Sequence, residues 1–108
     1  MRTKTLDPAI LDEIIRRVVE VAEPDKIILF GSAARNEMGP NSDLDLLVVK
    51  SGNIHRRKLA DNIRHALRGV EAAFDIIVVG TEDVQRYGDC PYTVIYPALR
   101  EGKVIYAT

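Results

Sequence analysis

The sequence predicts an α/β (α+β) domain, a small mixed sheet of three to four strands with helices packed against it. Short apolar runs alternate with segments of helical periodicity, and only a short polar link separates the first two runs. A right-handed crossover through a helix makes the second and third strands parallel neighbours, whereas the short link favours an antiparallel first pair. With 108 residues, we expect residues 1–108 to form one domain around one modest core.

Periodicity and turn signals set the expected elements. Asp7 is a good N-cap and Pro8 suits the first turn of a helix that Pro24 ends, before an apolar strand over 26–30. Gly69 is the expected C-terminal cap of a later helix. The remaining elements are, in order, a helical turn near 33–37, a strand over about 43–49, a helix over about 54–68, a strand over about 72–79, a short helix from 81, a helix ending near 101 and a strand over 104–106.

Composition excludes several classes of protein. Hydrophobic content of 46% and charged content of 29% are typical of a soluble globular chain. A net charge of −1 argues against nucleic acid as the main partner. The single cysteine, Cys90, excludes an internal disulfide and a cysteine-cluster metal site. There is no secretion signal and no apolar run as long as a membrane span, so we expect a cytoplasmic protein without membrane contact.

Three aspartates interrupt the apolar strands. Asp43 and Asp45 alternate along one strand and would point to the same face, and Asp75 lies inside the next strand. The expected topology brings the starts of both strands to one end of the sheet. Carboxylates there are costly unless a cation lies between them, and oxygen ligands favour Mg²⁺. Taken singly, Asp43 also fits a turn residue, and Asp75 also fits a carboxylate paired with an arginine.

A glycine–serine turn follows the first strand. The backbone N–H groups at Gly31 and Ser32 can cradle phosphate oxygens, and Arg35 can add a charged contact, although a plain strand end and a solvated arginine fit as well. The turn and the three aspartates together predict metal-dependent chemistry on a nucleotide. The basic residues of the helix over 54–68 are interpreted as a solvated face, and the alternative is a positive potential that acts on a triphosphate or an acidic partner.

The strings GSAAR, SDLDLLVV, FDIIVV and ALREGKVIY resemble the minimal nucleotidyltransferases of the DNA polymerase β-like superfamily. Asn36 stands where many members have glycine, and asparagine tolerates a left-handed backbone better than most residues. The residues that match the family pattern are Gly31, Ser32, Ala34, Arg35, Ser42, Asp43, Asp45, Leu46 and Asp75.

The resemblance implies a nucleotidyltransferase fold and transfer of a nucleoside monophosphate, AMP from ATP, to an acceptor. Asp43, Asp45 and Asp75 would be the catalytic residues and the ligands of two Mg²⁺ ions. The residues that would hold the nucleotide are Gly31, Ser32, Arg35 and Ser42.

Short members of this family often pair with a HEPN-domain protein as the antitoxin of a toxin–antitoxin system, and we expect such a partner. A non-catalytic antitoxin that acts by contact alone, and a transferase for a small molecule such as an aminoglycoside, are the alternatives. A homo-oligomer is compatible with the sequence.

Overall fold

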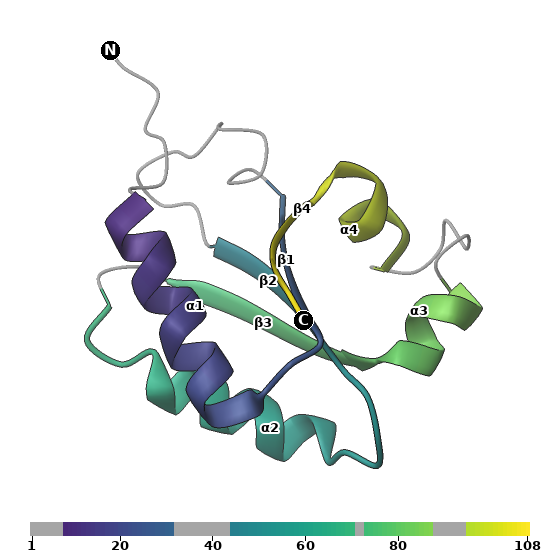
Figure 1. The fold of residues 1–108 in the computed structure, drawn as a ribbon, viewed down its shortest axis with the longest axis horizontal. Coiled ribbons are helices and arrows are strands. Elements are labelled where there is room, and N and C mark those ends of the chain that lie inside the picture. The colour runs from purple at the N-terminus through teal and green to yellow at the C-terminus, as the bar shows by residue number, and fades with distance from the viewer. Residues whose placement is uncertain (1–7, 32–43, 71–72, 88–94) are drawn as a thin grey trace.

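The computed structural model describes residues 8–31, 44–70, 73–87 and 95–108. Within these residues, four strands and four helices follow one another in the expected order (Figure 1). In chain order they are α1 (Pro8–Ala22), β1 (Lys26–Phe30), β2 (Leu44–Lys50), α2 (Arg56–Ala66), β3 (Phe74–Gly80), α3 (Thr81–Tyr87), α4 (Ile95–Glu101) and β4 (Lys103–Ala107). The helical turn predicted near 33–37 lies outside the described residues.

The sheet has the strand order β3-β2-β1-β4. β1 pairs antiparallel with both β2 and β4, whereas β2 and β3 are parallel. Both predicted pairings are therefore confirmed: the crossover through α2 makes β2 and β3 parallel, and the short link between β1 and β2 gives an antiparallel pair. As a result, β1 ends at the same end of the sheet at which β2 and β3 begin.

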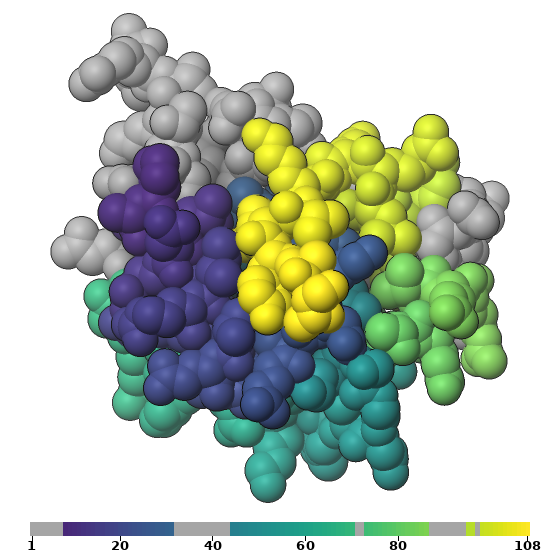
Figure 2. All heavy atoms as spheres, viewed as in Figure 1, coloured from purple at the N-terminus to yellow at the C-terminus, as the bar shows by residue number. Residues whose placement is uncertain are grey.

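Each face of the sheet is covered by a different pair of helices. On one face, α1 and α2 pack against the alternate strand residues that include Leu46 and Val48. On the other face, α4 packs against the intervening residues, among them Leu47 and Val49, with α3 beside it. Every second side chain of a strand points to the same face, so the apolar runs of β2 and β3 supply both cores. In Figure 2, α1 and the C-terminal residues of β4 form part of the same visible surface.

α2 is shorter at each end than the predicted helix over 54–68. His55 is the N-cap, and its Nδ1 accepts a hydrogen bond from the backbone N–H of Lys58 at 3.2 Å, which fixes where the helix begins. At the other end, Leu67 is the C-cap, and Gly69 follows with a φ of 88° that reverses the chain. From α1, the guanidinium of Arg17 donates to the Ala66 carbonyl at 3.1 Å and joins the two helices.

Asp25 links three segments at the other end of the sheet. Its backbone N–H donates to Val49, its carbonyl accepts from Thr108, and its carboxylate accepts the N–H of Ser51 at 2.5 Å. Hydrogen bonds from Ser51 hold the pKa of Asp25 below its usual value.

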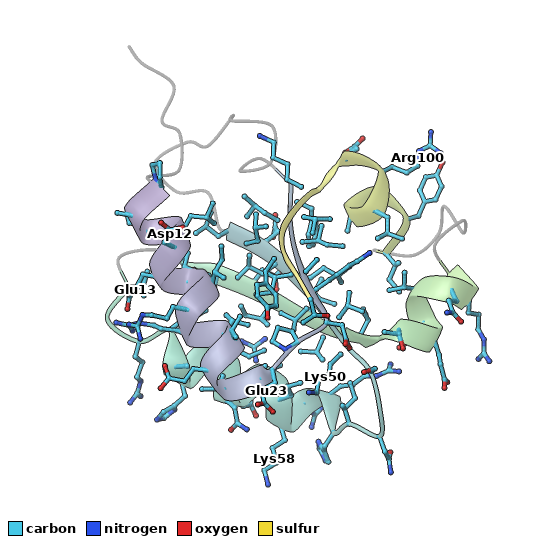
Figure 3. All side chains as sticks on the ribbon, in the orientation of Figure 1. Asp12, Glu13, Glu23, Lys50, Lys58 and Arg100 are labelled. Atoms are coloured by element: carbon cyan, nitrogen blue, oxygen red, sulfur yellow. The ribbon has the colours of Figure 1, made fainter. Side chains whose placement is uncertain are left out.

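Nearby, Lys50 donates to the Glu23 carbonyl at 2.8 Å (Figure 3). In the described part of the chain, no helix has the length and apolar character that crossing a bilayer requires.

Candidate functional site

Asp45 and Asp75 lie directly opposite each other on neighbouring parallel strands. In such a pair the Cα atoms are about 4.8 Å apart. Both side chains share the α3/α4 face, because Leu47 and Ile77, two residues further along each strand, lie in the core of that face. On β1, Phe30 stands opposite Asp45 in the antiparallel register. The structure therefore brings two of the three predicted carboxylates together at the end of β1.

Gly31 lies against the Asp45 carboxylate. Its φ of 73° is in the left-handed region, where a side chain is disfavoured. A Cβ atom at this position would also overlap the Asp45 Oδ2 atom. Two independent reasons therefore favour glycine at this position: the positive φ of the backbone and the close approach of the Asp45 carboxylate.

The two carboxylates differ in exposure. Asp75 is exposed although it lies between Phe74 and Ile76, and Asp45 is half-buried. The strand starts at Phe74, so Asp75 is its second residue and lies at the rim of the sheet. At that rim a carboxylate keeps water on one side and remains accessible to a ligand.

Two carboxylates that face the same way are the hard oxygen donors that Mg²⁺ prefers, and the residues present fit such an ion. Within the described residues, no three His, Cys, Asp or Glu side chains gather as a metal site. The third predicted ligand, Asp43, lies outside those residues, as do the predicted nucleotide-binding residues Ser32, Arg35 and Ser42.

A second feature lies at the opposite end of β2 and β3, about 20 Å from the two aspartates along the strands. There, a polar cavity of about 350 Å³ is lined by residues of the β2–α2 turn and the start of α3. Asp83 accepts the backbone N–H of Gly80 at 2.9 Å and forms an ion pair with Arg56. The sequence predicted the start of α3 at residues 81–83, but not the pairing of Asp83 with an arginine 27 residues away.

The sequence also matches the model of a known protein family. A family model described as "Polymerase beta, Nucleotidyltransferase" matches residues 12–108. No protein of curated function matches the sequence.

Several solved structures share the fold. One is a toxin–antitoxin with AMP-PNP, with 20% identity, a TM-score of 0.62 and coverage of 91% of this chain and 73% of that chain. Another is a mutant of the MntA–HpeT toxin–antitoxin, with 19% identity, a TM-score of 0.61 and coverage of 91% and 73%. A third is a tri-AMPylated Shewanella oneidensis HEPN toxin in complex with MNT antitoxin, with 19% identity, a TM-score of 0.55 and coverage of 93% and 71%.

The family match covers nearly the whole chain, and the mixed four-stranded sheet agrees with it. The chain belongs to the polymerase β nucleotidyltransferase family.

Proposed function

We propose that this chain transfers AMP from ATP to a HEPN-type partner protein and acts as the antitoxin of that partner. The observation that carries the proposal is the pair of carboxylates, Asp45 and Asp75, beside the close-packed backbone of Gly31. Two structural neighbours support the choice of nucleotide and partner: a toxin–antitoxin with AMP-PNP, and a tri-AMPylated HEPN toxin in complex with its MNT antitoxin.

In this proposal Asp45 and Asp75, together with Asp43, hold two Mg²⁺ ions. When bound, these ions supply positive charge to the phosphate oxygens and to the leaving group. Without them, the carboxylates would repel the triphosphate, so the nucleotide and the cations are expected to bind together.

The turn after β1 grips the triphosphate. At Gly31, the absence of a side chain and the positive φ let the backbone approach a ligand closely. Ser32 adds a hydroxyl donor, while Arg35 and Ser42 add contacts to the phosphates. Binding holds the donor nucleotide in a fixed orientation beside the acceptor. This lowers the activation free energy of transfer, because the translational and rotational entropy is lost on binding and not in the chemical step.

Asp75 orients the acceptor hydroxyl, since its carboxylate is the more exposed of the pair and faces the same side as Asp45. The acceptor oxygen forms a bond to the α-phosphorus of ATP, and the bond from that phosphorus to the bridging oxygen breaks. Pyrophosphate leaves with the electron pair of that bond, and Asp75 accepts the proton of the hydroxyl. The products are an adenylylated acceptor and pyrophosphate.

The test is the mass of the HEPN-type partner after incubation with this chain, ATP and Mg²⁺. We expect a gain of one or more adenylyl groups and release of pyrophosphate. Asp45→Asn and Asp75→Asn should each nearly abolish the gain, because transfer requires both carboxylates at the same time and the loss of either one removes most of the activity. Asp61→Asn, on the exposed face of α2, is the matched control and should transfer normally.

The contradicting result is a partner that gains no adenylyl group although it is stably bound and fully neutralised, both by the wild-type chain and by the Asp45→Asn, Asp75→Asn double variant. That result would show that the chain neutralises its partner by contact alone.

A further inference from the structure

Positive charge is concentrated on α2 and its flanking residues. Residues 55–68 contain five Lys or Arg and one Asp, a net charge of +4. Because the whole chain carries −1, the remaining residues together carry −5. The chain as a whole is nearly neutral, but this segment is strongly positive. The net charge of −1 is therefore no evidence against binding of nucleic acid at this segment.

Two arginines lie on one side of α2, and a third follows its C-terminal end. Arg57 and Arg64 are seven residues apart, which is about two helical turns and a rise of about 10 Å. Arg68 comes directly after the C-cap Leu67 and is also exposed. Ala60 and Ile63 point to the core from another side. We call the exposed side chains of Arg57, Lys58, Arg64 and Arg68 the basic face of α2.

The basic face has little internal compensation. Among the described residues, Arg57, Lys58 and Arg68 form no ion pair. Arg64 pairs only with Asp61, at 3.2 Å, and both side chains are more than half exposed, so water screens the pair. The side chain of Lys58 extends away from the body of the molecule (Figure 3).

Two of these cations lie where positive charge is electrostatically unfavourable for the helix. Arg57 and Lys58 lie in the first turn of α2, where the macrodipole is positive, and no acidic residue balances them there. Arg56, in the same turn, is accounted for by its ion pair with Asp83. The structure gives no such reason for the other two.

We propose that the basic face of α2 binds double-stranded nucleic acid through its phosphate backbone. Arginine presents a planar fork of donors that matches phosphate oxygens. Residues 55–68 include no Phe, Tyr or Trp side chain for stacking on unpaired bases, and the His55 imidazole is engaged as the N-cap of α2, which favours a duplex over a single strand. The exposed residues of α2 are all polar, whereas the centre of a protein–protein interface is usually apolar, so a phosphate backbone is favoured over an acidic protein.

This surface is separate from the candidate active site. α2 packs on one face of the sheet, and Asp45 and Asp75 lie on the other. A duplex bound to α2 would therefore leave the two carboxylates accessible, and binding does not depend on nucleotide transfer.

The experiment measures fluorescence anisotropy of two labelled duplexes of the same sequence, one RNA and one DNA, titrated with the full chain. With about three phosphates contacted, affinity should fall about 40-fold between about 50 and about 200 mM salt. A preference for one duplex identifies whether RNA or DNA is the natural ligand.

The test variant replaces Arg57, Arg64 and Arg68 with Glu, and a second variant replaces them with Gln. Circular dichroism checks that both fold. The charge-matched control replaces Lys26, Arg86 and Lys103, which are exposed on other elements, with Glu. We expect the Glu variant to lose at least about tenfold in affinity, the Gln variant to lose less, and the control to change affinity about twofold or less.

Three outcomes would overturn the inference. The first is no binding of either duplex at low salt, and the second is an equal loss in the test and control variants. The third is that the Glu variant binds duplex normally but no longer binds the HEPN-type partner, which would make the basic face a protein-docking surface.

Discussion

The two faces of the sheet differ in how completely helices cover them. In the described part of the chain, the α1/α2 face buries thirteen apolar residues in one cluster, and the α3/α4 face buries six. α1 and α2 have 15 and 11 residues, but α3 and α4 have seven each. The two aspartates lie on the less covered face. One face thus supplies most of the hydrophobic stabilisation, and the other keeps a polar rim accessible to ligand.

The largest expected effect compares two neighbouring leucines. Leu46 and Leu47 are fully buried on β2 but point to opposite faces. Leu46→Ala should lower the free energy of unfolding by about 3–5 kcal/mol, and Leu47→Ala by about 2–3 kcal/mol, because the smaller cluster can collapse into the cavity more easily. Denaturant titration measures both. Equal losses would show that the two faces contribute alike.

A second comparison concerns glycines. Gly31 and Gly69 both have positive φ, but only at Gly31 would a Cβ atom overlap another group. Gly69→Ala should cost about 1 kcal/mol through backbone strain alone. Gly31→Ala should cost about 2–3 kcal/mol, since the Asp45 carboxylate must also move. Thermal unfolding measures the difference, and a cost at Gly31 no larger than at Gly69 would contradict the close contact.

A smaller effect is expected at the rim. Asp75→Asn should leave the metal-free protein as stable as before, or up to about 1 kcal/mol more stable, since it relieves repulsion with Asp45 across the strand pair. Melting temperatures in chelator measure this. A clear drop would indicate that Asp75 has a structural ion pair, the alternative that its position in the sequence allowed.

The smallest expected effect depends on pH. The pKa of Asp25 is lowered in the folded protein by hydrogen bonds from Ser51. A carboxyl with a lowered folded-state pKa stabilises above its unfolded pKa, and that stabilisation is lost as the pH falls through the folded value. Wild type should therefore melt above Asp25→Asn at pH 7, and the gap should close below about pH 4. A gap that stays constant down to pH 2 would contradict this role.

Much of the fold follows from the sequence because the signals are local. Apolar strands bounded by Gly, Pro and Asn, a crossover helix and a short link predicted the order and direction of β1, β2 and β3. The register of Asp45 opposite Asp75 agrees with the predicted convergence. The roles of Asp43, Asp45 and Asp75 in metal binding and catalysis stay predictions.

Other features depend on tertiary contacts and have no local signal. The ion pair of Arg56 with Asp83 joins residues that are distant in sequence, and the imidazole of His55 rather than an earlier residue begins α2. Helix ends are also set by such contacts, and for this reason α2 is shorter than its periodicity suggested. The exposure of Asp75 follows from the position at which β3 begins, which the sequence placed two residues too early.

The central claim is that the less covered face binds a nucleotide through its carboxylates together with divalent cations. Calorimetric titration of the chain with ATP, once with Mg²⁺ and once with chelator, tests it most directly. The account predicts at least about tenfold tighter binding with Mg²⁺, and loss of that difference in the Asp45→Asn, Asp75→Asn double variant. Equal ATP affinity with Mg²⁺ and with chelator would contradict the account.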